Sequence, residues 1–536
     1  MQGAQTQGQR DGPGLRVLEP DFGYWAPELR ELYVHLPLQA VPAGGEEPFQ
    51  PLEVLVDGAR PRYAFWYVDG TAYAYWVVKE ASRRRLELFV PLAWRPGRTH
   101  EIRLRYSYCG KEEQQAVAVR TPGQGGVWEA SDGGNSAFLV REEAGLARRA
   151  EPVEFDLTVE AEVFPDPERT VRATVMTAPG VFEEIPCQVY DVKPCAPKGT
   201  YTSIPLVRFR AAVQLSMDAC GEALVILWHC PPKAAGGDTA PVSLEGSALG
   251  GRVQNEHYVI ELEADSGQLV RWDEKNTGRS FTFLRDPADP ASRGAMHYTP
   301  DVYRIGASWA HADDWDGPPF QEVRGPVFCE TARWAPMRDV PEVTARVTYR
   351  FYAARPEVRL CSVMRVLSDI NVLGFRNGGM IQSRDRYTHA AWKRQDGRIV
   401  RLPIEKCYGN DTGAPPPARA PLSTPWVAFY DSRERYGLAL ISANFAYFNK
   451  GPAQPNLSNA HRYVSLWNGK FLYTIRGMVF TYCSNIRSYH TPMDAGTVAY
   501  EEVALLPFTF EREDDAQFQP VETLLREMHN PLVVVP

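Results

Sequence analysis

The residues that could do chemistry are densest between positions 297 and 330, where aromatic and acidic side chains alternate. Trp faces pack against the C–H surfaces of sugars, and carboxylates accept hydrogen bonds from hydroxyl groups. Hydrolysis of a glycosidic bond also needs two carboxylates that flank the bond. The pattern predicts a carbohydrate site with catalytic Asp313, Asp314 and Asp316 and with substrate-binding residues His297, Tyr298, Arg304, Trp309 and Trp315. The alternative is a solvated acidic turn beside core tryptophans.

A second group of candidate residues lies between positions 376 and 392 and continues between 482 and 490. β-Elimination on a uronic acid needs a cation or amide against the carboxylate, a base for the α-proton and a Tyr that protonates the leaving oxygen. The candidates for catalysis are Arg386, Tyr387 and His389, and those for substrate binding are Trp392, Arg487, Tyr489 and His490. The alternative is a set of arginine-rich strand faces and loop aromatics.

Other chemistry has weak support in the sequence. His311 and Asp313 have an HxD spacing that could bind a divalent ion, but such a pair is common by chance, and we predict no metal site and no cofactor. A glycine-rich phosphate loop and a GxSxG nucleophile elbow are both missing from the sequence. The nine cysteines include no CxxC pair, which favours buried unpaired thiols in a reducing compartment.

The elements that must position these residues read as strands. Gly (42) and Pro (44) supply frequent turns, and 11% of the residues are aromatic. Apolar residues alternate with polar ones in many short segments, for example 52–56, 101–106, 170–175 and 343–351. The segment Val521 to Met528 is the only helix that we expect. The predicted fold class is therefore all-β, with less than about 10% helix.

Length and charge narrow the function classes. A chain of 536 residues predicts several domains, and a net charge of −8 argues against nucleic-acid binding through bulk electrostatics. No apolar run approaches the roughly 18 residues of a membrane-spanning helix, and we see no signal peptide, so we expect a cytoplasmic protein without a membrane partner. Two Gly/Pro-rich linkers divide the chain into a flexible tail (1–20), an immunoglobulin-like β-sandwich (21–125), a linking β-domain (126–245) and a large C-terminal sandwich (246–536).

Short motifs in order along residues 130–536 resemble the C-terminal β-domains of α-mannosidases, glycoside hydrolase family 38. Asn255 to Leu262 with Asp265-Ser266-Gly267 resembles the start of that family's last domain, Trp426 to Ile441 its hairpin, and Glu527 to Leu532 its end. The resemblance implies a galactose-mutarotase-like supersandwich in the C-terminal domain. Family members carry their nucleophile and zinc ligands in an N-terminal barrel, whereas the first 130 residues here read as strands. The family's activity therefore does not transfer.

Three functions stay open from the sequence. The leading hypothesis is an enzyme that hydrolyses glycosidic bonds of an oligo- or polysaccharide. The second is a polysaccharide lyase that acts on a uronic-acid glycan, and the third is a non-catalytic glycan-binding or accessory subunit. A homo-oligomer is compatible with each of them.

Overall fold

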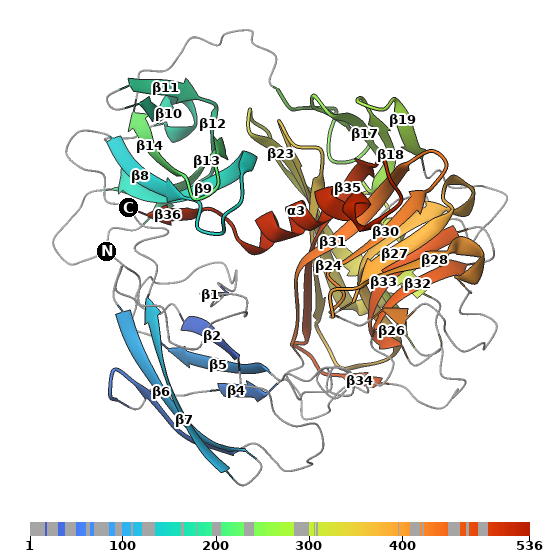
Figure 1. The fold of residues 1–536 in the computed structure, drawn as a ribbon, viewed down its shortest axis with the longest axis horizontal. Helices are drawn as coiled ribbons and strands as arrows, with labels where there is room; N and C mark the ends of the chain where they lie inside the picture. Colours follow the sequence, from blue (N-terminus) through green and yellow to red (C-terminus); the bar gives the residue numbers. More distant parts are fainter. Residues whose placement is uncertain are drawn as a thin grey trace. The chain divides into compact units, whose positions relative to one another are not determined.

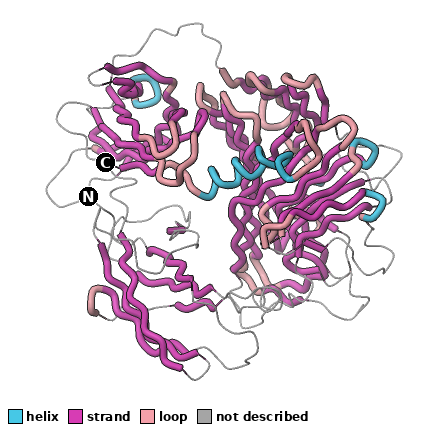
Figure 2. Tube along the Cα trace, viewed as in Figure 1, coloured by secondary structure: helices cyan, strands magenta, loops and turns pink. Residues whose placement is uncertain are grey.

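The computed structural model describes residues 17–18, 31–37, 50–59, 65–68, 85–91, 99–108, 111–120, 135–161, 166–178, 181–195, 205–229, 241–282, 300–304, 306, 309–394, 396–407, 419–420, 423–448, 461–467, 471–480 and 491–535. This part of the chain is nearly all β, with many antiparallel sheets, which confirms the predicted fold class (Figure 2). None of its helices is long and apolar enough to cross a membrane.

The chain divides into two compact units, and the first consists of Met1–Gly125 with Val535–Pro536. It contains two antiparallel sheets, with the strand orders β1-β2-β5-β4 and β3-β6-β7. In β6, Glu101, Arg103 and Arg105 are exposed at every second position, as the pleat of a strand requires. The strands are β1 (Val17–Leu18), β2 (Glu31–Pro37), β3 (Gln50–Val56), β4 (Phe65–Val68), β5 (Arg85–Pro91), β6 (Thr99–Tyr108) and β7 (Lys111–Arg120).

The second unit, Gly126–Val534, begins with two small antiparallel sheets that share one apolar core. Their orders are β11-β10-β14-β8-β36 and β12-β13-β9, and Phe138, Leu157, Phe209 and Leu227 are fully buried between them. The elements are β8 (Asn135–Arg141), β9 (Arg148–Glu160), α2 (Pro167–Thr170), β10 (Val171–Ala178), β11 (Val181–Ile185), β12 (Cys187–Cys195), β13 (Leu206–Met217), β14 (Glu222–His229) and β36 (Val533–Val535).

A five-stranded meander follows in the sequence. Each strand pairs with the next along the chain, and Tyr258, Ile260, Leu269 and Trp272 point into the core at every second or third position. The strands are β15 (Ser243–Glu245), β16 (Arg252–Gln254), β17 (Tyr258–Leu262), β18 (Leu269–Glu274) and β19 (Arg279–Thr282).

Two larger sheets form the rest of the second unit (Figure 1). We call the first the inner-arginine sheet, because it contributes Arg462 and Arg476 to the core, and its order is β21-β20-β26-β33-β32-β29, with β34 also on β26. Its strands are β20 (Asp301–Arg304), β21 (Trp309–His311), β26 (Ile370–Ser383), β29 (Arg419–Ala420), β32 (His461–Trp467), β33 (Phe471–Phe480) and β34 (Thr491–Met493).

The second, which we call the nine-stranded sheet, has the order β22-β23-β24-β25-β35-β31-β30-β27-β28. Its strands β30 and β31 form the predicted hairpin between Trp426 and Ile441, and these two residues pair with each other. The strands are β22 (Phe320–Val323), β23 (Phe328–Met337), β24 (Val340–Tyr352), β25 (Val358–Val366), β27 (His389–Lys393), β28 (Ile399–Pro403), β30 (Trp426–Asp431), β31 (Tyr436–Phe448) and β35 (Val498–Thr509).

One helix, α3 (Gln519–His529), packs against the β31 and β35 part of the nine-stranded sheet, as Figure 1 shows. Val521, Leu524, Leu525 and Met528 lie on its buried face with a spacing of three and four residues. Pro520 stands in the first turn, where its missing N–H breaks no hydrogen bond. The predicted helix from Val521 to Met528 is therefore confirmed.

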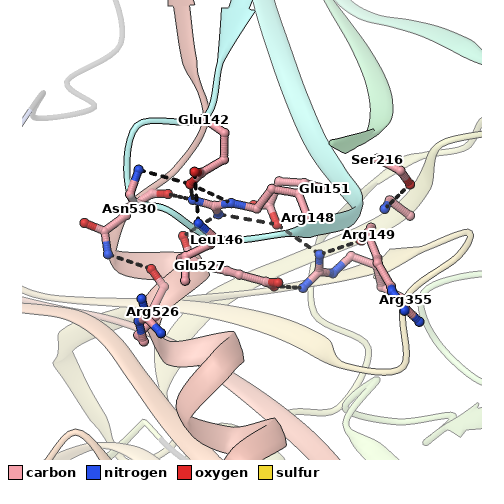
Figure 3. Close-up of polar contacts among 12 residues, drawn as sticks. Glu142, Leu146, Arg148, Arg149, Glu151, Ser216, Arg355, Arg526, Glu527 and Asn530 are labelled. Atoms are coloured by element: carbon pink, nitrogen blue, oxygen red, sulfur yellow. Dashed lines mark hydrogen bonds and ion pairs between the residues drawn. The ribbon is translucent and has the colours of Figure 1, made fainter. Parts of the chain in front are cut away.

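A buried ionic network ties α3 to the small sheets (Figure 3). The guanidinium of Arg355 forms ion pairs with Glu151 at 2.9 Å, Glu357 at 2.6 Å and Glu527 at 2.6 Å. Arg148 pairs with Glu142 at 2.8 Å and donates to the carbonyl of Asn530. The partners come from positions far apart in the chain, so the network links α3 with β9 and with the segment around Arg355.

Candidate functional site

The acidic stretch that the sequence singled out forms a tight turn between β21 and β22. Ala312–Asp314 makes one 3-10 turn, and the backbone N–H of His311 donates to Oδ2 of Asp314 at 2.9 Å. Trp315 is buried and donates its indole N–H to the carbonyl of Pro336 at 3.2 Å. Gly317 has a φ of 61° and donates its N–H to Asp265 O, so the turn needs a glycine there. These bonds fix the turn on its neighbours.

A surface pocket of about 410 Å³ opens beside this turn. Asp316 and Arg338 line it as exposed residues, Asp314 is half-buried, and the buried Trp315 also belongs to the lining. The lining thus combines two acidic residues, one arginine and one aromatic residue, a mixture that suits a polyhydroxylated ligand. Its lining is Asp314, Trp315, Asp316, Pro318, Ala335 and Arg338.

The third predicted carboxylate, Asp313, does not line the pocket. It is only 5% exposed and faces the interior, where its charge acts on the buried Tyr349. Burial raises the pKa of the Tyr349 hydroxyl and Asp313 adds to that rise, while Arg333 opposes it. The structure therefore brings Asp314 and Asp316 together with Trp315 and places Asp313 among core residues.

Under the turn lies a buried cluster built on Asp301. Arg376 donates to both oxygens of this fully buried carboxylate, with the Nε bond at 2.7 Å, and Nδ1 of His311 lies 3.2 Å from Oδ2. Burial alone would raise the pKa of Asp301, but Arg376 and His311 outweigh it and hold the pKa below its ordinary value. The cluster anchors His311, whose backbone N–H in turn holds Asp314.

Two further predicted sugar-binding residues are engaged within the protein. The guanidinium carbon of Arg376 lies 3.5 Å from the ring centroid of Trp309, and Gly374 lies so close that a Cβ there would be 2.2 Å from this ring. Arg304 forms an ion pair with Glu342 at 3.0 Å. Neither residue lines the pocket.

The described members of the second predicted cluster make contacts within the protein. Tyr387 is buried and donates its hydroxyl to Gln382 at 3.2 Å, and burial raises its pKa well above the ordinary value. Arg386 donates to the carbonyl of Ser280. The ring of His389 stacks on Tyr430 with centroids 5.1 Å apart. Packing and backbone contacts thus occupy these side chains, as they do for the buried Trp392.

Five of the predicted binding residues lie outside the described residues: His297, Tyr298, Arg487, Tyr489 and His490. Their predicted roles stay predictions.

Thiol chemistry has little support in the described part of the chain. Burial raises the pKa of Cys187, Cys361 and Cys407 to about 12 in each case, which disfavours the nucleophilic thiolate. The six described cysteines are not in disulfides.

Sequence reasoning missed Arg338 in the pocket and a buried charge cluster of Arg462, Arg476 and Glu501 in the core. A signal for the cluster was present, because both arginines stand in segments rich in apolar and aromatic residues, and both are buried in the structure. Only the strand pairing shows that they meet.

Comparison with known proteins found no matching family model and no matching curated protein. A solved structure of a protein in the glycosyl hydrolase family 38 from Enterococcus faecalis is 11% identical, with a TM-score of 0.42, and the match covers 74% of this chain and 47% of that one. A family 36 α-galactosidase from Geobacillus stearothermophilus is 10% identical, with a TM-score of 0.28, over 50% of this chain and 40% of that one. A putative aldose 1-epimerase from Klebsiella pneumoniae is 9% identical, with a TM-score of 0.28, over 52% of this chain and 84% of that one. The chain spans about half the length of the family 38 protein, and these similarities assign no activity to it.

Proposed function

We propose that the pocket beside β21 binds a glycan and that the protein hydrolyses a glycosidic bond there. The observation that carries the proposal is the convergence of Asp314, Asp316, Arg338 and Trp315 on one pocket. Carboxylate oxygens accept from sugar hydroxyls, the guanidinium donates to ring and hydroxyl oxygens, and the indole offers an apolar wall.

The two carboxylates take different parts in the proposed reaction. Asp314 has one oxygen held by the N–H of His311, so its other oxygen is fixed in direction, as a nucleophile or a water-activating base must be. Asp316 lies on the solvent side and protonates the leaving glycosidic oxygen. Arg338 and Trp315 position the sugar and take no proton.

The test is a panel of oligo- and polysaccharides assayed with the full chain for binding and for newly formed reducing ends. We expect at least one glycan that binds and is hydrolysed, with Asp314→Asn and Asp316→Asn lowering turnover by about 10²-fold or more. Asp218→Asn, the same change at an exposed turn, is the matched control and keeps full activity. An unsaturated product, formed without addition of water, would show that the reaction is elimination and not hydrolysis. Wild-type turnover in both pocket variants would refute the proposed site.

Binding without turnover is the remaining outcome. In that case the pocket variants lose affinity for the bound glycan while Asp218→Asn retains it, and the chain is a glycan-binding subunit. A panel with neither binding nor product would contradict the proposed function as a whole.

A further inference from the structure

A polar layer crosses the core between the inner-arginine sheet and the nine-stranded sheet. In the first sheet, Arg476 of β33 pairs across strands with Asn377 of β26 and with Arg462 of β32. In the second, Glu501 of β35 pairs with Ser362 of β25 and Phe445 of β31. Each row thus has three residues on neighbouring strands, and side-chain contacts join the two rows.

The contacts between the rows centre on one carboxylate oxygen. Oε1 of Glu501 accepts from Nη2 of Arg462 at 2.9 Å and from Nε of Arg476 at 3.0 Å. Arg462 also donates to the carbonyl of Gly378 at 3.0 Å, and Arg476 donates to the hydroxyl of Ser442 at 2.7 Å. Both guanidiniums thus depend on the same single anion.

The layer carries one positive charge in excess. Side-chain exposure is 0% for Arg462 and 1% for both Arg476 and Glu501, so water outside the protein screens none of them. Arg476 and Glu501 are the charged groups that act on Arg462 among the described residues, and one carboxylate cannot neutralise two guanidiniums. A buried charge is stable only when it is paired.

Two donors in the layer are also without a partner among the described residues. Within the described part of the chain, Nε of Arg462 and Nη1 of Arg476 have almost no exposed surface and make no hydrogen bond. Leaving such a donor unsatisfied in a core is costly, and these two belong to the residues that carry the excess charge. The unmet hydrogen bonds and the unmet charge therefore coincide.

We propose that this layer binds a small monovalent anion such as chloride. One negative charge matches the single excess positive charge, and a halide accepts N–H groups from several directions. The anion contacts Nε of Arg462 and Nη1 of Arg476. Oε2 of Glu501 also lacks a hydrogen-bond partner among the described residues, so the anion lies on the side of the guanidiniums away from that oxygen.

Buried water is the competing occupant. Water molecules would satisfy the two donors and Oε2 of Glu501, but they would leave the charge uncompensated. The two occupants predict different effects of the salt on protein stability. A bound halide stabilises the folded state by mass action, whereas water does not.

The first measurement is thermal unfolding of the full chain in sodium chloride or bromide against sodium gluconate at equal ionic strength. We expect the Tm to be higher in the halides by about 2 °C or more and to rise with halide concentration. Arg476→Met leaves Arg462 and Glu501 as a neutral pair, so the halide effect disappears. Arg398→Met, at a side chain that is 85% exposed, is the matched control and keeps it.

Crystals grown or soaked in bromide decide the case even if Arg476→Met does not fold. An anomalous peak within contact distance of Arg462 Nε and Arg476 Nη1 supports the proposal. Equal Tm values in halide and gluconate with no peak in the layer would overturn it. A halide effect that survives in Arg476→Met would also overturn it, because the anion would then bind elsewhere.

Discussion

Nδ1 of His311 lies 3.2 Å from Oδ2 of the fully buried Asp301, while the backbone N–H of the same histidine donates to Asp314 at the pocket. One residue therefore connects a buried ionic cluster with a carboxylate of the proposed glycan site. Core packing and site geometry are coupled at this position, and the coupling has a measurable consequence.

Asp301→Asn should destabilise the protein and disturb the pocket together. The change leaves Arg376 buried without its anion, which costs about 3–5 kcal/mol in comparable pairs. Urea unfolding measures the loss. Asp316→Asn is the contrasting variant, because Asp316 is exposed, and its free energy of unfolding should stay within about 0.5 kcal/mol of wild type while its glycan affinity falls. Equal stability of Asp301→Asn and wild type would contradict the role of the cluster.

The lining of the pocket predicts that substitutions of Asp314 and Asp313 have different effects on turnover and stability. Asp314→Asn removes a pocket carboxylate and should lower glycan turnover by about 10²-fold or more with little change in Tm. Asp313→Asn changes a buried group and should lower the Tm, with turnover of the remaining folded protein close to wild type. Steady-state kinetics and thermal unfolding of both variants check this, and the opposite pattern would mean that Asp313 is the reacting group.

Glu142 should make stability depend on acid pH. Burial would raise its pKa, but backbone N–H groups of Cys220, Leu146 and Ala144 together with Arg148 lower it from 4.5 to about 2. As the pH falls, the unfolded chain binds a proton at Glu142 before the folded protein does. The carboxylate therefore contributes about 3 kcal/mol above pH ~4.5, and this contribution is lost between pH ~4.5 and ~2.

Glu142→Gln tests this directly. The difference in free energy of unfolding between wild type and variant should be largest above pH ~5 and should shrink towards pH ~2. Urea unfolding at a series of pH values measures it. A difference that stays constant with pH would show that Glu142 acts only through packing.

The network around Arg355 predicts a strong effect far from the pocket. Arg355→Met leaves Glu151, Glu357 and Glu527 buried near one another without their shared cation, so we expect a loss of about 3–5 kcal/mol. Arg526→Met, on the exposed side of α3, is the matched control and should change stability by less than about 0.5 kcal/mol. Similar unfolding curves for the two variants would show that the network does not stabilise the folded protein.

The sequence predicts the strands and α3 well because each depends on local periodicity. Alternation at 343–351 and at 170–175 corresponds to β24 and β10, and the apolar spacing from Val521 to Met528 corresponds to α3. The division into three β-domains stays a prediction.

The site was harder to predict because side-chain direction depends on the turn. Asp313, Asp314 and Asp316 look equivalent in sequence, but the 3-10 turn at Ala312–Asp314 sends Asp313 inward and leaves Asp314 and Asp316 at the pocket. Arg338 directly follows β23, 22 positions after Asp316 in the chain, so only tertiary structure brings it to the same pocket.

A crystal structure of the full chain with a bound oligosaccharide from the glycan panel tests the central claim most directly. The account predicts a sugar ring in contact with Trp315 and hydroxyl groups within hydrogen-bond distance of Asp314, Asp316 or Arg338. A glycan bound elsewhere on the protein, with this pocket empty, would contradict it.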